Sequence, residues 1–357
     1  MTSKCPQSTD AFQDLYRIFA SRDGRVLEFE ILPPAFGPIL EDDCSIGITK
    51  KYLVQAFVAA RRVFFDGLKS YTNSFDNRAS LDTSDQKFKG DEADKRLTVA
   101  SEIILLFDCE HLTACNWRKR RLGTLFNSDQ KKFIHNLDIE LSLMTTYLCS
   151  PLHRHTKSPT LWQHRQWIQA HLVRLQNSDY QAAQNLFRAE LSIALRAGEL
   201  HPRNYYAFTY MRQIHRRLSE SGKGGTEVLS VQLGNSIIGS TLDWCLAHPA
   251  DISGLMFLLY LLDAVPDTAL RLDTVSKVAW FALDIRWEGE SIWTFVDLAI
   301  RKFNLLGSLT DSSPYPWAAL CDPVLLEGKS GRPWKAWLDK AHVHWAHTLQ
   351  STNKRST

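Results

Sequence analysis

One short stretch of the sequence holds the residue types that bind transition metals. Cys149, His153, His155 and His164 lie close together along the chain, and thiolate and imidazole are ligands that zinc prefers. Their spacing fits no common zinc motif, and His153 and His155 straddle a turn flanked by prolines. We therefore predict that this chain holds no metal ion of its own.

A second stretch is strongly basic. It reads Arg118-Lys119-Arg120-Arg121, with Lys131 and Lys132 nearby. Basic runs of this kind can bind nucleic acid or a nuclear import receptor. The net charge of the whole chain is only +3, which does not by itself indicate a polyanionic partner. We interpret two of these arginines as parts of a structural repeat and the other residues as a solvated face, and we predict no nucleic-acid partner.

The elements that must position such residues follow from a recurrence. A bulky apolar residue returns five times, at spacings of 45, 46, 47 and 38 residues. In the first three copies an Arg follows three or four places later, which puts both side chains on one face of a helix. A period of about 20 to 50 residues is typical of helical repeats that bury their apolar faces against their neighbours. We predict an all-α chain of antiparallel helical hairpins, with a core that includes Trp117, Trp162, Trp167, Phe208, Leu255 and Trp293.

Composition divides the rest of the chain. Prolines 33 and 34 forbid a continuous helix near the N-terminus, and Ser, Asn, Asp and Lys dominate a later polar stretch. The predicted segments are an irregular extension (1–47), a helix (48–69), a flexible polar insertion (70–96), five helical repeats (97–305), and an irregular segment with a final helix (306–357).

Cysteine usage and hydropathy indicate the compartment. The seven cysteines are scattered without a CxxC pair, which suits reduced thiols better than a disulfide framework. The residues after Met1 lack the apolar run of a signal peptide. The longest apolar run, Ile252 to Val265, is too short to span a bilayer. We expect a cytoplasmic protein without a membrane span.

Three of the repeat copies resemble a known family. They read Leu161-Trp162-Gln163-His164-Arg165-Gln166-Trp167-Ile168, then His201-Pro202-Arg203-Asn204-Tyr205-Tyr206-Ala207-Phe208, then Gly289-Glu290-Ser291-Ile292-Trp293. These copies are similar to the repeats of protein prenyltransferase alpha subunits, which carry Asn-Tyr-x-x-Trp-x-x-Arg-Arg/Gln-Trp. The long N-terminal extension and the decayed third and fourth copies resemble the divergent alpha-subunit-repeat-containing proteins most.

The resemblance implies a fold, an activity and a partner. Alpha subunits of this family form a right-handed, TPR-like superhelical crescent of hairpins around a beta subunit. The beta subunit holds the catalytic zinc and the isoprenoid pocket, so this chain itself would carry no cofactor. The heterodimer transfers a geranylgeranyl or farnesyl group from its diphosphate to a C-terminal cysteine of a protein substrate. For the divergent members, the implied partner is the beta subunit of the Rab-type geranylgeranyltransferase.

The resemblance also implies roles for residues in two turns. Lys157 stands where the family has a lysine that contacts the diphosphate, whose developing negative charge an ammonium stabilises. Ser158 and Pro159 replace the family's Asn and Tyr there, so an exposed lysine on a turn is the alternative. Arg203, Tyr205 and Tyr206 would line the seam with the beta subunit and donate hydrogen bonds; the alternative is that they shape the turn.

Two further points stay open. His164 would reach the cleft or the partner, whereas Arg165 is expected to bond helix-end carbonyls of the adjoining hairpin. Because folds of this kind host unrelated functions, the alternative to an enzyme subunit is a non-catalytic alpha-solenoid scaffold for protein–protein interaction that has lost prenyltransferase function.

Overall fold

The computed structural model describes residues 10–76, 84–126, 129–175, 180–221 and 226–305. The chain divides into two compact units, which are described separately. The first unit comprises residues 1–177 and 199–201, and the second comprises residues 178–198 and 202–357. The predicted irregular segment and final helix in residues 306–357 lie outside the described residues.

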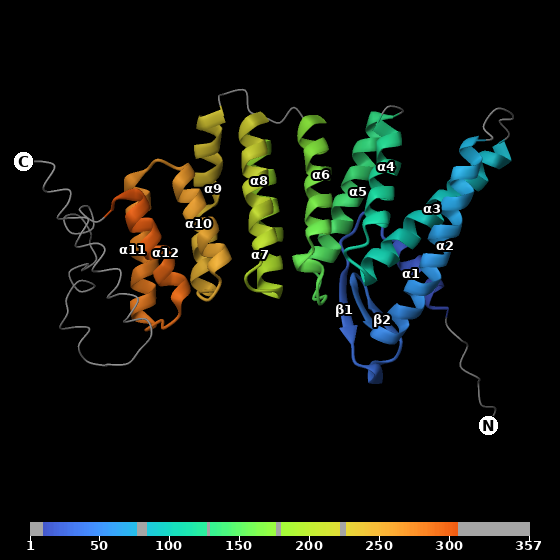
Figure 1. Ribbon diagram of the computed structural model, residues 1–357, viewed down its shortest axis with the longest axis horizontal. Helices are drawn as coiled ribbons and strands as arrows, with labels where there is room; N and C mark the ends of the chain where they lie inside the picture. Colours follow the sequence, from blue (N-terminus) through green and yellow to red (C-terminus); the bar gives the residue numbers. More distant parts are fainter. Residues whose placement is uncertain (1–9, 77–83, 127–128, 176–179, 222–225, 306–357) are drawn as a thin grey trace, which may run out of the picture. The chain divides into compact units, whose positions relative to one another are not determined.

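The first unit begins with a helix and a small sheet (Figure 1). Helix α1 (Ala11–Ala20) is followed by strands β1 (Glu28–Leu32), β2 (Ile39–Asp42) and β3 (Ser45–Thr49). The strand order is β1-β3-β2, with β1 parallel and β2 antiparallel to β3.

The sheet corrects the prediction of an all-α chain and, with α1, that of an irregular extension over the described part of residues 1–47, which begins at residue 10. Phe29, Ile46 and Ile48 are buried, on the face that alternate residues of a strand share. The backbone N–H groups of Leu27 and Phe29 donate to the hydroxyls of Thr146 and Ser150, at 3.0 and 2.9 Å. The strands are short and the prolines lie between them, so the alternation of apolar residues was the signal that the prediction missed.

A long helical hairpin follows the sheet. Helix α2 (Lys50–Asp76) packs along α3 (Ser84–Phe107), and Phe64 and Leu97 are buried near its base. Within the predicted insertion, residues 70–76 belong to α2 and residues 84–96 to α3, while residues 77–83 lie outside the described part; the flexibility of the segment stays a prediction. A polar sequence rich in Lys, Asp and Glu also suits a helix, because only its anchored end needs apolar contacts.

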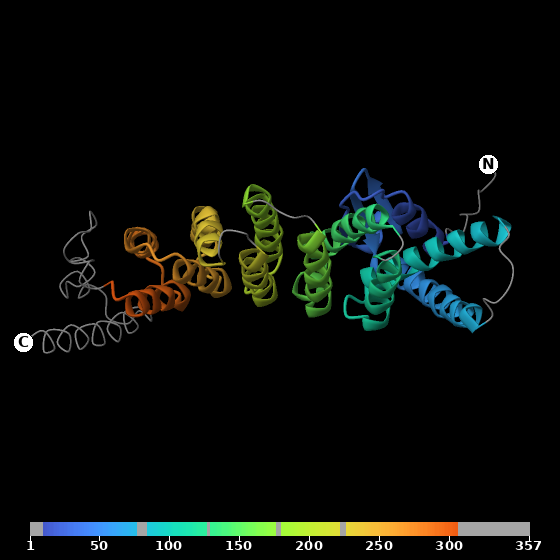
Figure 2. The same cartoon turned by 90° about the horizontal axis from the view of Figure 1, so that it is seen from above.

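The remaining described residues form helices in consecutive pairs (Figures 1 and 2). The first unit continues with α4 (Leu112–Phe126), α5 (Gln130–Cys149), a 3₁₀ turn η2 (His155–Lys157) and α6 (Pro159–Leu175). The others are α7 (Tyr180–Leu200), α8 (Tyr205–Ser221), α9 (Thr226–Ala247), α10 (Ile252–Ala264), α11 (Thr268–Asp284) and α12 (Glu290–Phe303). Helical hairpins are thus confirmed, whereas the superhelical path and the count of five repeats stay predictions.

Three of the repeat helices begin at a polar cap four residues before the bulky residue, whereas α12 follows Gly289 and has no side-chain cap. Ser158, Asn204 and Asp251 stand at these positions. Their side-chain oxygens accept hydrogen bonds from backbone N–H groups two or three residues later, at 3.1 Å for Ser158, 3.2 Å for Asn204, and 2.9 and 3.2 Å for Asp251. Such caps satisfy N–H groups that the first helical turn leaves unpaired. The cap function is therefore retained although the residue type varies.

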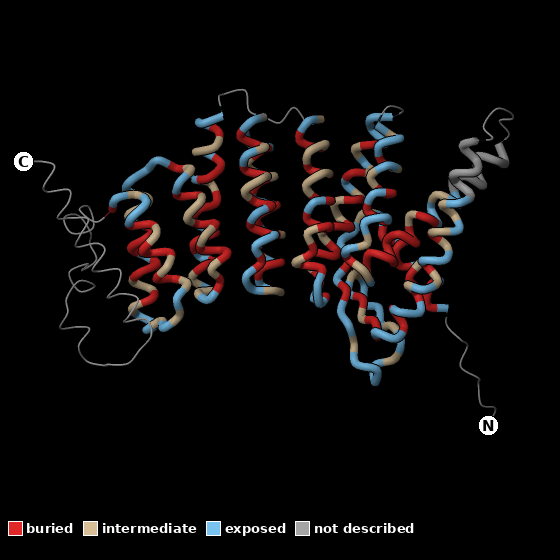
Figure 3. Tube along the Cα trace, in the orientation of Figure 1, coloured by how far each residue is buried: buried red, intermediate tan, exposed pale blue. Residues whose placement is uncertain are grey.

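The capped helices bury the residues that mark the repeat, and Figure 3 shows buried positions along the helix faces that meet. Trp167 differs from the other five predicted core residues because it is half-buried and its ring lies edge-on against His171, at 4.5 Å between centroids. The exposed fractions of the others are 9% for Trp117, 3% for Trp162, 0% for Phe208, 0% for Leu255 and 4% for Trp293.

The buried tryptophans repeat one detail. The indole N–H of Trp162 donates to the carbonyl of Thr156 at 2.8 Å, and that of Trp293 donates to the carbonyl of Trp287 at 3.1 Å. In both cases the acceptor lies six residues earlier. The indole therefore fixes the turn that precedes its helix.

Replacing Asp251 by Ala should destabilise the protein by about 3 kcal/mol, because the buried carboxylate caps α10 and also accepts the Arg203 N–H at 2.7 Å. The matched control is Asp267→Ala, which removes an exposed cap that accepts one N–H and should cost about 1 kcal/mol. Chemical denaturation followed by circular dichroism measures both values. An equal loss of unfolding free energy in the two variants would contradict the claim that Asp251 contributes more than an exposed cap.

Candidate functional site

The predicted functional residues fall into two neighbourhoods. Lys157 and His164 belong to the first unit, whereas Arg203, Tyr205 and Tyr206 belong to the second. Each neighbourhood is therefore built from its own contacts.

Lys157 ends the 3₁₀ turn η2 and is half-buried. The hydroxyl of the preceding residue, Thr156, lies 2.8 Å from Nδ1 of His201. Burial lowers the pKa of His201, and the positive charges of Lys157 and His153 lower it further. The turn thus gathers an ammonium and two imidazoles, a combination that favours an anion such as a phosphate.

His201 is a member of this group that the sequence prediction missed. It opens one of the repeat copies, but its contact partner Thr156 lies 45 residues away in sequence. The sequence offered one indication of this contact: the turns that hold Thr156 and His201 stand at equivalent places in their repeat copies, just before Trp162 and Phe208.

Arg203, Tyr205 and Tyr206 present exposed side chains at the start of α8. Tyr205 is 56% exposed and Tyr206 is 47% exposed, and the Arg203 side chain is also on the surface. Arg203 has a φ of 59°, which is uncommon for a residue with a side chain. Its backbone N–H donates to Asp251 at 2.7 Å, so a buried carboxylate holds the turn in this conformation and leaves the three side chains available to a partner.

His164 lies inside the helix packing instead of on the surface. Its side chain is 0% exposed and Nε2 lies 2.8 Å from Oε1 of Glu140. Burial lowers the pKa of His164, so the neutral ring donates its Nε2–H to the carboxylate. Among the residues that the structure describes, Nδ1 has no hydrogen-bond partner. This placement contradicts the expectation that His164 meets a substrate or a partner.

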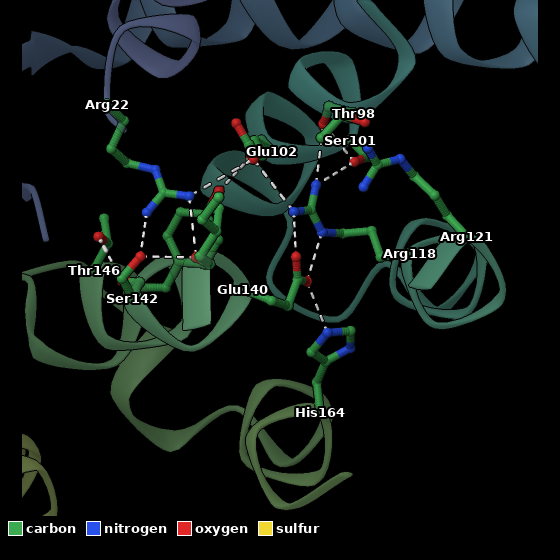
Figure 4. Close-up of polar contacts among 12 residues, drawn as sticks. Arg22, Thr98, Ser101, Glu102, Arg118, Arg121, Glu140, Ser142, Thr146 and His164 are labelled. Carbon is green, nitrogen blue, oxygen red and sulfur yellow. Dashed lines mark hydrogen bonds and ion pairs between the residues drawn. The ribbon is translucent and has the colours of Figure 1, made fainter. Parts of the chain in front are cut away.

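Glu140 connects His164 to a buried ionic network (Figure 4). Arg118 donates to both carboxylate oxygens of Glu140, from Nε at 2.7 Å and from Nη2 at 2.5 Å. The Arg118 guanidinium also donates to Glu102 at 3.2 Å, and Arg22 lies 4.0 Å from Glu102. Four of the five residues come from α3, α4, α5 and α6, and Arg22 follows the end of α1. None of the five is more than 4% exposed.

The charges of this network balance. Burial disfavours the charged form of Glu140, but the Arg118 guanidinium and the His164 hydrogen bond hold the pKa of that carboxyl well below its usual range. Burial raises the pKa of Glu102, against the attraction of Arg118 and Arg22. Two arginines thus face two carboxyls in a region without water access, which is an arrangement that fixes helices and does not suit a substrate.

The second unit contains a simpler contact of the same kind, in which a buried glutamate accepts a hydrogen bond from the next helix. Tyr210 stands two residues after Phe208, as His164 stands two residues after Trp162. Its hydroxyl donates to Glu190 of α7 at 2.6 Å, and both residues are buried. A buried glutamate on one helix therefore receives a donor from the same repeat position of the next helix in both units.

Arg165 and two arginines of the basic run form hydrogen bonds or ion pairs within the fold. Arg165 donates to the carbonyl of Leu141 and the hydroxyl of Thr145, at 3.2 and 2.8 Å, and both acceptors lie within α5. In the basic run, Arg118 is buried in the network and Arg121 pairs with Asp94 at 2.7 Å, whereas Arg120 is exposed.

The cysteines and histidines do not gather. Over the described ranges, no group of three or more His, Cys, Asp or Glu side chains is arranged to hold a metal ion. Nε2 of His155 bonds the carbonyl of Leu105 at 3.0 Å. Burial raises the pKa of Cys109 to about 11 and that of Cys115 to about 12, so both are neutral thiols at pH 7.

Comparison with known proteins identifies one repeat. Residues 187–218 match the family model of the protein prenyltransferase alpha subunit repeat. The match begins within α7 and ends within α8, and it includes Glu190, Arg203, Tyr205, Phe208 and Tyr210. No curated protein was found to match the chain. None of the described helices is both long enough and apolar enough to cross a membrane.

Replacing Glu140 by Gln should destabilise the first unit by about 3 kcal/mol, because the buried Arg118 charge loses its main partner. The control is Asp94→Asn, which breaks the half-exposed pair with Arg121 and should cost less than about 1 kcal/mol. Denaturation midpoints of the two variants give the comparison. A Glu140→Gln variant as stable as Asp94→Asn would show that the network contributes little.

Stability should fall as the pH drops from about 6.5 toward 4, because burial lowers the pKa of His155 to about 4 from an ordinary value of 6.5. In that window the unfolded chain binds a proton that the folded chain does not, so unfolding is favoured by up to about 3 kcal/mol. His155→Gln keeps a donor for Leu105 and does not titrate, so its stability should vary less with pH. Urea denaturation at several pH values tests this; an unchanged slope would contradict it.

Proposed function

We propose that this chain is an alpha-type subunit of a heterodimeric protein prenyltransferase. The complex transfers a geranylgeranyl or farnesyl group from its diphosphate to a C-terminal cysteine of a protein substrate. The observation that carries the proposal is the alpha subunit repeat in residues 187–218, which includes the turn with the exposed Arg203, Tyr205 and Tyr206.

The exposed turn before α8 supports a role in binding the beta subunit. Tyrosine and arginine are the residue types that contribute most often to protein interfaces. The Asp251 carboxylate accepts a hydrogen bond from the Arg203 N–H and holds the backbone of the turn. The three side chains therefore lose less conformational freedom when a partner covers them.

The cationic turn at Lys157 supports a role at the diphosphate. In the reaction, the cysteine sulfur forms a bond to C1 of the isoprenoid while the bond from C1 to the diphosphate oxygen breaks. The diphosphate leaves with the electron pair, and a nearby ammonium stabilises its growing charge. The positive charges of Lys157 and His153 lower the pKa of His201, and an anion bound at this turn would offset that repulsion.

The proposal divides the chemistry between two chains. A cysteine thiol becomes a thiolate at neutral pH when a metal ion binds it, and in the family that this repeat resembles, the beta subunit supplies the zinc. This chain would contribute its helical hairpins, the Arg203–Tyr206 turn and Lys157. The Rab-type geranylgeranyltransferase beta subunit is the first partner to try.

Co-expression of the two chains tests the partnership. We expect a complex of one alpha-type and one beta chain on size-exclusion chromatography, and transfer of labelled isoprenoid to a protein ending in cysteine only when both chains are present. If no prenyltransferase beta subunit binds, the chain is better explained as a non-catalytic helical scaffold.

Lys157→Ala should lower kcat/KM of the complex between about tenfold and a hundredfold, because the leaving diphosphate loses an ammonium. Lys157→Arg should keep part of the rate. Lys131→Ala, an exposed lysine on α5, is the control and should not change it. Steady-state assays on intact heterodimers measure the effect, and a Lys157→Ala complex with full activity would remove Lys157 from the proposal.

A further inference from the structure

The outward face of α2 carries an apolar stripe. Val54 is 37% exposed and Val58 is 45% exposed, and the half-buried Phe65 follows on the same face, since these positions differ by four and seven residues. Valine and phenylalanine gain nothing from contact with water, so the stripe is a surface that another apolar environment can cover.

Basic side chains border this stripe on both sides. At 100° per residue, Lys50 and Arg61 lie on one side of it, and Lys51 and Arg62 lie on the other. All four are exposed. Within the described part of the chain, no carboxylate forms an ion pair with any of them.

Charge is concentrated on this helix. Residues 50–69 contain five basic residues and one acidic residue, Asp66, whereas the whole chain has a net charge of only +3. Asp66 is already engaged by Lys69, at 3.8 Å. The outward face of α2 is therefore much more positive than the average surface of this protein.

Beyond Arg61 a further apolar patch lies toward the turn between α3 and α4, a turn that also carries the carboxylates of Asp108 and the exposed Glu110. The Arg61 guanidinium lies over the rings of Phe57 and Phe65, 6.0 and 5.5 Å from their centroids, and Phe57 stacks on Phe107 at 4.3 Å. Phe107 is 36% exposed, and Leu112, at the start of α4, is 61% exposed. Arg61 thus covers apolar surface with its stem and keeps its charge at the rim.

We propose that this face of α2 binds the surface of an anionic lipid membrane, with the helix axis parallel to the bilayer. An apolar stripe bordered by Lys and Arg is the pattern of helices that lie in the membrane interface. The apolar side chains enter the boundary between headgroups and acyl chains, and the cations meet lipid phosphates and carboxylates.

Charge complementarity selects this occupant. A zwitterionic surface would leave four cations without counter-charges, and a basic partner would be repelled. The acidic helix of another protein is the competing occupant. The inference goes beyond the proposed function and does not depend on a beta subunit, because the full chain alone can be tested.

Co-sedimentation of the full chain with lipid vesicles tests the proposal. We expect binding to vesicles of phosphatidylcholine mixed with phosphatidylserine, at least about tenfold weaker binding to phosphatidylcholine alone, and loss of binding at high salt. The double charge reversal Lys51→Glu with Arg62→Glu should weaken binding to the mixed vesicles by at least about tenfold.

Two further variants distinguish the contribution of the α2 face to vesicle binding from the effect of the protein's net charge. Lys131→Glu with Lys132→Glu makes the same charge change on exposed positions of α5 and should leave vesicle affinity within about twofold. Val54→Ser with Val58→Ser keeps every charge and should weaken binding severalfold, because less apolar surface enters the membrane. Thermal unfolding of each variant checks that the fold is retained.

Three results would overturn the proposal. They are failure of the full chain to bind the mixed vesicles, an equal loss of affinity in the α5 control, and full affinity in the serine variant. The first result would leave an acidic protein helix as the better occupant of this face.

Discussion

The buried carboxylate of Glu140 is the constraint on which the first unit depends. It receives Arg118 from α4 and His164 from α6, so three consecutive helices meet at one charge. A buried ion pair adds little net stability, but removal of one partner leaves an uncompensated charge. The helices can therefore pack in only one register. In the second unit a buried glutamate, Glu190, likewise accepts a hydrogen bond from the next helix, where the donor is the Tyr210 hydroxyl.

This register fixes the turn that carries the candidate chemistry. Once α6 is held by His164, the Trp162 indole reaches back to the Thr156 carbonyl, and His155 reaches the Leu105 carbonyl. Lys157 follows directly on these two anchored residues. Buried polar contacts thus do not perform chemistry here, but they hold an ammonium and its neighbouring imidazoles in a defined position, which a diphosphate site requires.

The sequence was sufficient for features that depend on local spacing. The period of the bulky residues predicted the helical hairpins, and the residue four places earlier is a cap in the three copies at Ser158, Asn204 and Asp251. Features that depend on distant contacts were missed. Nothing near His164 in the sequence distinguishes a histidine that faces solvent from one that faces Glu140 on another helix. His201 was missed for the same reason, since Thr156 meets it from another repeat copy.

Hydrogen–deuterium exchange of the chain, alone and with a prenyltransferase beta subunit, would show whether the two turns contact that partner. Amides protected by a partner exchange more slowly when the partner is bound. We expect added protection in the Arg203–Tyr206 turn and around Lys157, where the exposed tyrosines and the lysine ammonium lie. Unchanged exchange in both turns, in a complex shown to form, would contradict the proposal that each of these turns contacts the beta subunit.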